Sequence, residues 1–147
     1  MAEKKILIVD YDPAHLKSLV ALFEPHFLVI KAGDGQAGYE KFREEKPDIV
    51  ILEGILPKIH GFDLTKRISE ETHGRVPVII VTGLYRGPQY RMEALNTFGA
   101  SDYFEKPVDK DRLLRSVMGL LEEEEEIGED LPDSAEVLQK LSQRIKS

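Results

Sequence analysis

The sequence predicts an α/β domain in which five parallel strands form a doubly wound sheet with helices on both faces. Short apolar runs alternate along the chain with segments whose apolar residues recur at helical spacing, and this alternation favours a parallel sheet with right-handed crossovers. The length of 147 residues suits one domain, and a hydrophobic fraction of 41% suffices for one sizeable core.

The first strand is predicted over residues 6–9, because a short apolar run is typical of a strand buried on both faces. A helix is expected next, since Asp12 can cap it and Pro13 suits its first position. The apolar face of this helix is predicted to comprise Leu16, Leu19, Val20 and Phe23.

The second strand is predicted over residues 27–30. A turn at residues 34–35 then leads into a helix whose apolar side includes Ala37 and Phe42. The third strand, residues 49–52, has the sequence Ile-Val-Ile-Leu. It is the most apolar of the five, so we expect it at the centre of the sheet.

The remaining elements follow the same alternation. A loop over residues 54–61 precedes a helix, the fourth strand (78–81), a further helix (89–98) and a short fifth strand (102–104). The helix after the loop is expected to bury Phe62, Leu64 and Ile68. The apolar face of the last helix is expected to comprise Leu113, Leu114, Val117 and Leu120.

The chain divides by charge near residue 121. Residues 1–121 contain 18 acidic and 17 basic residues, a net charge of −1, whereas residues 122–147 contain 9 and 3, a net charge of −6. We interpret 1–121 as the folded domain and 122–147 as an acidic linker with a short amphipathic helix. The glutamates at 122–126 are expected to form the solvated end of the last helix, which Gly128 then breaks.

The helix in the tail is predicted from about Ser134 to Lys146. Residues 133–136 have the pattern of a capping box. The apolar side chains that fall on one side of this helix are Val137, Leu138, Leu141 and Ile145. Such a short helix is not stable alone, so we expect it to dock on this domain, on a second copy or on a partner.

Composition excludes several classes of protein. The absence of cysteine rules out disulfides, thiolate catalysis and cysteine-ligated zinc. There is no uninterrupted apolar stretch long enough to span a membrane, no signal peptide and no basic stripe for nucleic acid. We therefore expect a cytoplasmic protein that binds neither membrane nor nucleic acid.

Polar residues gather where the predicted strands end. Because the carboxyl ends of parallel strands share one edge of the sheet, these side chains are expected to converge there. Clustered carboxylates suit magnesium, and a lysine with a hydroxyl suits the oxygens of a phosphoryl group. The residues in question are Asp10, Tyr11 and Asp12 after the first strand, Glu53 after the third, Thr82 after the fourth, Tyr103 on the fifth and Lys106 after it.

Five ordered motifs carry a resemblance over roughly residues 4–121. The chain resembles the response regulator receiver family, of which the chemotaxis regulators are small stand-alone members. This resemblance implies a flavodoxin-like receiver fold with a cis Lys106–Pro107 bond. The motifs are residues 5–10, 47–53, Leu56-Pro57 with Gly61-Phe62, 77–83 and 99–107.

The resemblance also implies roles for the strand-end residues. In this family an aspartate after the third strand accepts phosphate, and two acids after the first strand hold magnesium. By position, Asp10 matches one of these acids, Thr82 and Lys106 match the residues that contact the phosphoryl group, and Tyr103 matches an aromatic that swings inward on activation. The family's usual docking surface is the fourth helix, the fifth strand and the last helix. In this chain that surface would include Arg91, Tyr103 and Leu113.

Two positions depart from the family pattern, and a third departure is less diagnostic. Glu53 stands where the phospho-accepting aspartate is expected, and Tyr11 stands where the principal metal-holding acid is expected. His60 replaces a common acid in the following loop; we expect it, like His73, to be a surface residue.

The departures predict a site without catalytic residues. Glutamate is longer than aspartate by about 1.5 Å, and a displacement of about 1 Å costs phosphoryl transfer on the order of a hundredfold. Magnesium needs near-ideal octahedral geometry, so with only Asp10 and Glu53 as remaining ligands we expect weak binding or none. We predict no cofactor, no enzyme activity and little or no phosphorylation.

Two roles remain open for Glu53, and two for Asp12. Glu53 either reaches Lys106 and Thr82 and holds an active-like state without phosphate, which we favour, or it merely replaces the charge. Asp12 is either a helix cap or an acid of the site. Tyr103 and Thr82 each have an ordinary structural interpretation too, as a packed ring and a strand-end hydroxyl.

Three functions are consistent with these residues. The first is an unphosphorylated adaptor that binds a kinase, a regulator or another signalling protein. The second is a phosphorelay receiver that accepts phosphate weakly at Glu53. The third is an oligomerisation module in which the tail helix pairs copies into a homo-dimer. Phosphate uptake discriminates the first from the second, and tail deletion tests the third.

Overall fold

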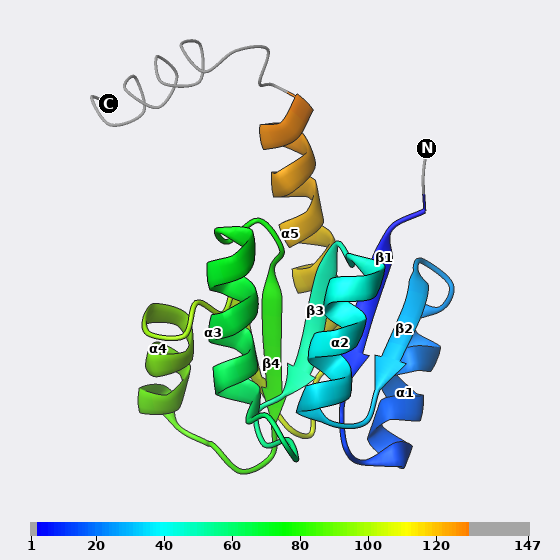
Figure 1. The fold of residues 1–147 in the computed structure, drawn as a ribbon. Coiled ribbons are helices and arrows are strands. Elements are labelled where there is room, and N and C mark those ends of the chain that lie inside the picture. The colour runs from blue at the N-terminus through cyan, green and yellow to red at the C-terminus, as the bar shows by residue number, and fades with distance from the viewer. Residues whose placement is uncertain (1–2, 130–147) are drawn as a thin grey trace, which may run out of the picture.

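Five parallel strands form one sheet in the computed structural model, which describes residues 3–129 (Figure 1). The spatial order is β2-β1-β3-β4-β5, so the most apolar strand lies at the centre, as predicted. The strands are β1 (Lys5–Val9), β2 (Leu28–Ala32), β3 (Ile49–Glu53), β4 (Val78–Thr82) and β5 (Asp102–Glu105).

Helices cover both faces of the sheet, which confirms the doubly wound fold class. One face packs against α1 (Pro13–Phe23) and α5 (Lys110–Glu129), and the other against α2 (Gly35–Glu45), α3 (Gly61–Thr72) and α4 (Pro88–Asn96) (Figure 1). Alternate side chains of each strand enter the two cores: in β1, Leu7 packs on the α2–α3–α4 side and Ile8 on the α1–α5 side. Both faces are therefore buried, which explains the continuous apolar runs.

The strand register brings the candidate site together. Val9 pairs with Leu52 between β1 and β3, and Thr82 pairs with Glu105 between β4 and β5. The ends of the strands are thus level at one edge of the sheet. Four polar residues that end or directly follow strands meet at this edge: Asp10, Glu53, Thr82 and Lys106.

Some predicted boundaries were wrong. β2 runs over 28–32 instead of 27–30, because its pairing with β1 begins at Leu28. The last helix does not end at Gly128 but continues to Glu129, the last residue that the structure describes. The predicted tail helix lies outside the described residues. Within residues 3–129, no helix has the length and apolar character needed to cross a membrane.

Gly61 makes a close approach between backbone segments next to the site. It is the first residue of α3, and its N–H donates to the carbonyl of Gly54 over 3.0 Å. A Cβ at this position would lie 2.1 Å from the backbone oxygen of Glu53 and 2.7 Å from that of Gly54. Only glycine therefore lets α3 start this close to the end of β3.

We predict that Gly61→Ala destabilises the domain by roughly 1–3 kcal/mol, because backbone must move to admit the methyl group. Gly119→Ala is the matched control. Gly119 is exposed within α5 and its Cβ would meet nothing within 4 Å, so alanine should stabilise the helix by about 0.5–1 kcal/mol. Urea unfolding followed by circular dichroism measures both changes. Equal stability of the two variants would contradict this account of Gly61.

Candidate functional site

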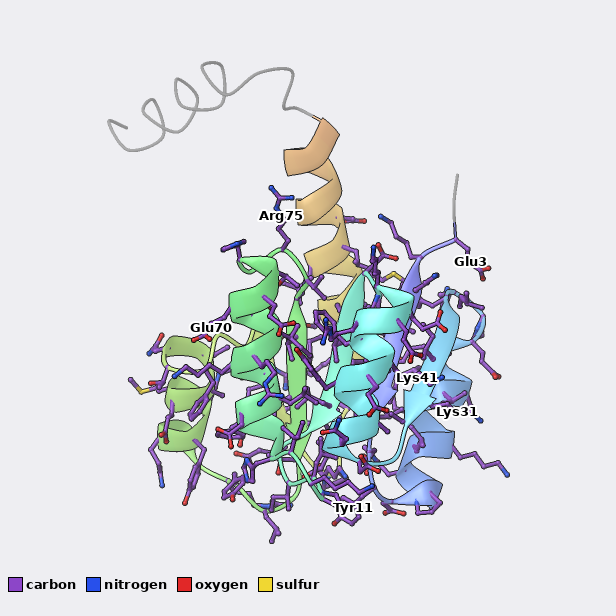
Figure 2. All side chains as sticks on the ribbon, viewed as in Figure 1. Glu3, Tyr11, Lys31, Lys41, Glu70 and Arg75 are labelled. Atoms are coloured by element: carbon purple, nitrogen blue, oxygen red, sulfur yellow. The ribbon has the colours of Figure 1, made fainter. Side chains whose placement is uncertain are left out.

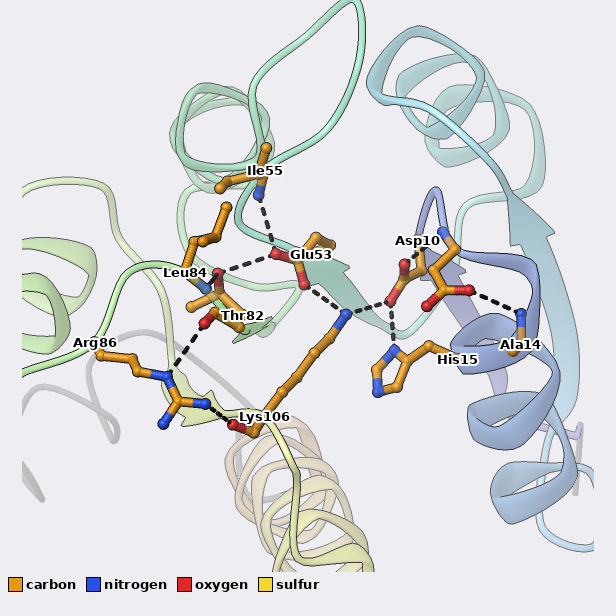
Figure 3. A network of polar contacts seen from close by, with 11 residues as sticks. Asp10, Ala14, His15, Glu53, Ile55, Thr82, Leu84, Arg86 and Lys106 are labelled. Carbon is orange, nitrogen blue, oxygen red and sulfur yellow. Dashed lines mark hydrogen bonds and ion pairs between the residues drawn. The ribbon is translucent and has the colours of Figure 1, made fainter.

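Lys106 connects two buried carboxylates at the edge of the sheet. Its Nζ lies 3.2 Å from Oδ2 of Asp10 and 2.9 Å from Oε2 of Glu53 (Figure 3). The two acids are 2% and 4% exposed. The lysine directly follows β5, and the Lys106–Pro107 bond is cis. One cation from β5 thus pairs with acids from β1 and β3.

Glu53 also reaches the end of β4. Its Oε1 accepts hydrogen bonds from the Thr82 hydroxyl, at 3.0 Å, and from the Ile55 N–H, at 3.3 Å (Figure 3). Its Oε2 accepts no hydrogen bond of good geometry, so its 2.9 Å contact with Lys106 is an ion pair. The two carboxylate oxygens therefore have separate tasks, one toward the hydroxyl and one toward the cation.

Asp10 has a partner that the sequence analysis missed. Nδ1 of His15 lies 2.5 Å from Oδ2 of Asp10, the oxygen that also faces Lys106 (Figure 3). The other oxygen, Oδ1, accepts the backbone N–H of Asp12 at 2.9 Å. His15 lies in the first turn of α1. The sequence did contain a signal for this contact, because His15 comes three residues after the predicted cap. Helix side chains tilt toward the N-terminus of their helix, which here lies next to the end of β1.

These contacts set the ionisation of the pair. Burial by itself raises the pKa of the Asp10 carboxyl, but hydrogen bonds from His15 and from the Asp12 backbone, with the charge of Lys106, hold this pKa below its usual value. Burial likewise opposes the charge on Lys106, but Glu53 and then Asp10 outweigh it and raise the lysine's pKa. Asp10 is therefore an anion and Lys106 a cation at neutral pH.

The side chains of Asp12 and Tyr11 lie beside this cluster, although the backbone N–H of Asp12 donates to Asp10. The Asp12 carboxylate caps α1 by accepting the Ala14 N–H at 3.0 Å, so the cap interpretation is confirmed. Asp12 is exposed, and this hydrogen bond engages one of its two carboxylate oxygens, so its interpretation as a site acid stays a prediction. Tyr11 is 52% exposed at the same edge of the molecule (Figure 2).

The residues present do not fit a magnesium ion. Both oxygens of Asp10 already accept hydrogen bonds, and both oxygens of Glu53 face donors or Lys106. Within residues 3–129, no group of three or more His, Cys, Asp or Glu side chains is arranged to hold a metal ion. Magnesium requires several oxygen ligands in octahedral geometry, and Tyr11 supplies no carboxylate.

Tyr103 is turned into the protein. Its side chain is 3% exposed, and its hydroxyl donates to the backbone oxygen of Tyr85 in the β4–α4 loop. Its ring packs edge-on against Phe62, with centroids 6.3 Å apart. Burial, followed by the charges of Glu105 and Glu53, raises the pKa of Tyr103 to about 12. The Tyr103 phenol is therefore uncharged at neutral pH, and its buried hydroxyl has a hydrogen-bond acceptor in the Tyr85 carbonyl.

His60 and Leu113 differ from expectation. His60 is half-buried rather than a free surface residue: its Nδ1 accepts the Phe62 N–H at the start of α3, and its Nε2 lies 3.1 Å from the Tyr85 hydroxyl. The sequence could not show this pair, because its members are 25 residues apart. Leu113 is completely buried in the α1–α5 core, so it cannot belong to a docking surface. His73 is exposed at the end of α3.

The chain matches one family of proteins over most of its length. A sequence model of the response regulator receiver domain matches residues 6–118. Protein PilH from Pseudomonas aeruginosa is 35% identical over 119 residues, which cover 80% of this chain and 97% of that relative. The chain spans between 7% and 52% of the length of other curated relatives.

Two solved structures share the fold. A CheY-like response regulator receiver domain protein from Methanospirillum hungatei has a TM-score of 0.77 and 31% identity, covering 85% of this chain and 98% of that one. The CheX–CheY–BeF3–Mg complex from Borrelia burgdorferi gives a TM-score of 0.73 and 29% identity, with 80% and 88% covered. The likeness therefore extends over at least four-fifths of this chain.

We predict that Lys106→Met destabilises the domain by about 3 kcal/mol, because it leaves two buried carboxylates without their shared cation. Adding Glu53→Gln should recover part of this loss. Lys58→Met is the control: Lys58 pairs with Asp34 at 3.6 Å but is 65% exposed, so the change should stay within about 0.5 kcal/mol. Urea unfolding at neutral pH measures each variant, and similar losses for both lysines would contradict the assigned role of Lys106.

Proposed function

We propose that this chain, which belongs to the response regulator receiver domain family and is a receiver domain of a two-component signalling system, signals by protein contact without taking up phosphate. One observation carries the proposal. The Glu53 carboxylate contacts both Thr82 and Lys106, the two residues that match the phosphoryl-contacting positions of the family. An internal carboxylate thus makes contacts that a phosphoryl group makes elsewhere in the family.

The state of the acceptor position argues against phosphate uptake. Oε1 of Glu53 is engaged by Thr82 and Ile55, and Oε2 by Lys106. Phosphoryl transfer depends on in-line positioning of the nucleophile and on neutralisation by a metal ion. A longer acceptor held in other contacts disfavours the first requirement, and the side chain of Tyr11 in place of an acid disfavours the second. Both support a receiver that does not become phosphorylated.

The same contacts favour an active-like conformation. Glu53 draws the Thr82 hydroxyl toward itself at 3.0 Å. Tyr103 lies inward and is 3% exposed, the position that the family's aromatic takes on activation. Its hydroxyl donates to Tyr85, in the loop that follows β4. We infer that Glu53 holds this arrangement in the absence of phosphate.

The face formed by α4, β5 and α5 is the surface we assign to a protein partner. A groove of about 780 Å³ lies there, lined by residues that include Arg91, Tyr103 and Arg112. The guanidinium of Arg91 donates to the backbone oxygen of Tyr103 over 2.8 Å, so the groove is tied to the strand that carries the switch aromatic. A kinase or another signalling protein that recognises activated receivers would dock on this face.

Phosphate uptake is tested with magnesium and beryllofluoride, a phosphoryl mimic, added to the nitrogen-15-labelled chain. We predict that the amides around Asp10, Glu53, Thr82 and Lys106 stay in place, because the acceptor is engaged and a metal-holding acid is missing. The double variant Tyr11→Asp with Glu53→Asp, which restores the family pattern, should respond to the same additions. A wild-type response that includes Tyr103 would overturn the proposal.

Two variants distinguish the effect of the side-chain length of Glu53 from the effect of its negative charge. Glu53→Asp keeps the charge but withdraws the carboxylate by about 1.5 Å, so Thr82 should lose its hydrogen bond and Tyr103 should leave its inward position. Glu53→Gln keeps the length and should leave Tyr103 in place. Carbon-13-labelled tyrosine ring resonances report the change. If Glu53→Asp leaves the Tyr103 resonance unchanged, Glu53 merely replaces the charge.

A further inference from the structure

We propose that His15 is a positioning residue that weakens divalent-cation binding at the site, by holding the Asp10 carboxylate together with Lys106. The inference rests on the proposed function and deepens it, because it names a third residue, besides Glu53 and Tyr11, that disfavours metal binding there. Neither the family pattern at the strand ends nor the substituted acids pointed to this residue.

The start of α1 places His15 against Asp10. Asp12 caps the helix and Pro13 is its first residue, so these two residues set the direction of the turn that carries His15. The imidazole then turns back to the end of β1, with Nδ1 2.5 Å from Oδ2 of Asp10 (Figure 3). The side chain of His15 is 18% exposed and that of Asp10 is 2% exposed, so this contact is largely sheltered from water.

The direction of this hydrogen bond follows from the state of Asp10. The carboxylate is ionised and can only accept, so Nδ1 of His15 carries the hydrogen in either charge state of the ring. Lys106 approaches the same Oδ2 at 3.2 Å, and the Asp12 N–H occupies Oδ1 at 2.9 Å. Three donors thus surround one carboxylate.

Such a carboxylate is a poor ligand for magnesium. A divalent cation that used Oδ2 would have to displace a hydrogen-bearing ring nitrogen, the Lys106 ammonium, or both. Imidazole does not compensate as a ligand, because magnesium prefers oxygen. An acid restored at position 11 would therefore still meet an Asp10 that His15 holds. His15 thus occupies, together with Lys106, the Asp10 oxygen that a metal ion would need.

The test uses the full-length Tyr11→Asp/Glu53→Asp variant as the acid-restored background. Into it we place His15→Leu, which removes the donor while keeping an apolar side chain of moderate size, or His15→Asn, which keeps a donor near the place of Nδ1. Magnesium alone is titrated against the amide spectrum. We expect His15→Leu to tighten magnesium binding about tenfold or more relative to the background, as loss of one charge-assisted hydrogen bond implies. His15→Asn should change it little.

A second measurement needs no change at position 15. Imidazole nitrogen-15 resonances of the acid-restored variant should show His15 leaving Asp10 as magnesium saturates the site, while the exposed His26 stays unchanged. The inference is overturned if His15→Leu, still folded by its amide spectrum, binds magnesium no more tightly than the background, or if the His15 resonances do not move at saturation. Magnesium binding by the wild-type chain would instead overturn the proposed function.

Discussion

The shared ion pair of Lys106 with Asp10 and Glu53 is the constraint on which the edge of the sheet depends. The ends of β1 and β3 each carry a carboxylate that is almost fully buried, and an isolated buried carboxylate costs several kcal/mol. The lysine that follows β5 lies within 3.2 Å of both. The ends of β1, β3 and β5 are therefore linked through the charge of Lys106.

Under the proposed function, the Glu53 carboxylate takes the place of the phosphoryl group that shifts other receivers to their active state. A receiver that needs phosphate and a metal populates its active arrangement when these bind, because a ligand shifts an equilibrium by its differential affinity for the two states. Here Glu53 already contacts both the Thr82 hydroxyl, at 3.0 Å, and the Lys106 ammonium, at 2.9 Å. Under the proposed function, the internal carboxylate biases the same equilibrium toward the state with an inward Tyr103.

Aromatic packing extends this arrangement from the site to the α4–β5–α5 face. Phe62 at the start of α3 contacts the rings of His60, Tyr85, Phe98 and Tyr103. Tyr85 in turn packs on Tyr90 of α4, with centroids 5.2 Å apart. The loop between β4 and α4 is thus fastened by rings as well as by the hydroxyl of Tyr103. These rings join the start of α3, the β4–α4 loop, β5 and α4 in one cluster.

The sequence by itself determined the fold class, the central place of β3 and the gathering of Asp10, Glu53, Thr82 and Lys106 at one edge. Each follows from periodicity or from the rule that parallel strands end together, which are local or topological facts. Only the tertiary structure decided that His15 holds Asp10, that His60 meets Tyr85 and that Leu113 is buried. These features depend on the direction of each side chain and on contacts between separate segments of the chain. A small rotation of a helix about its axis decides whether a given side chain is buried against a partner or exposed to solvent.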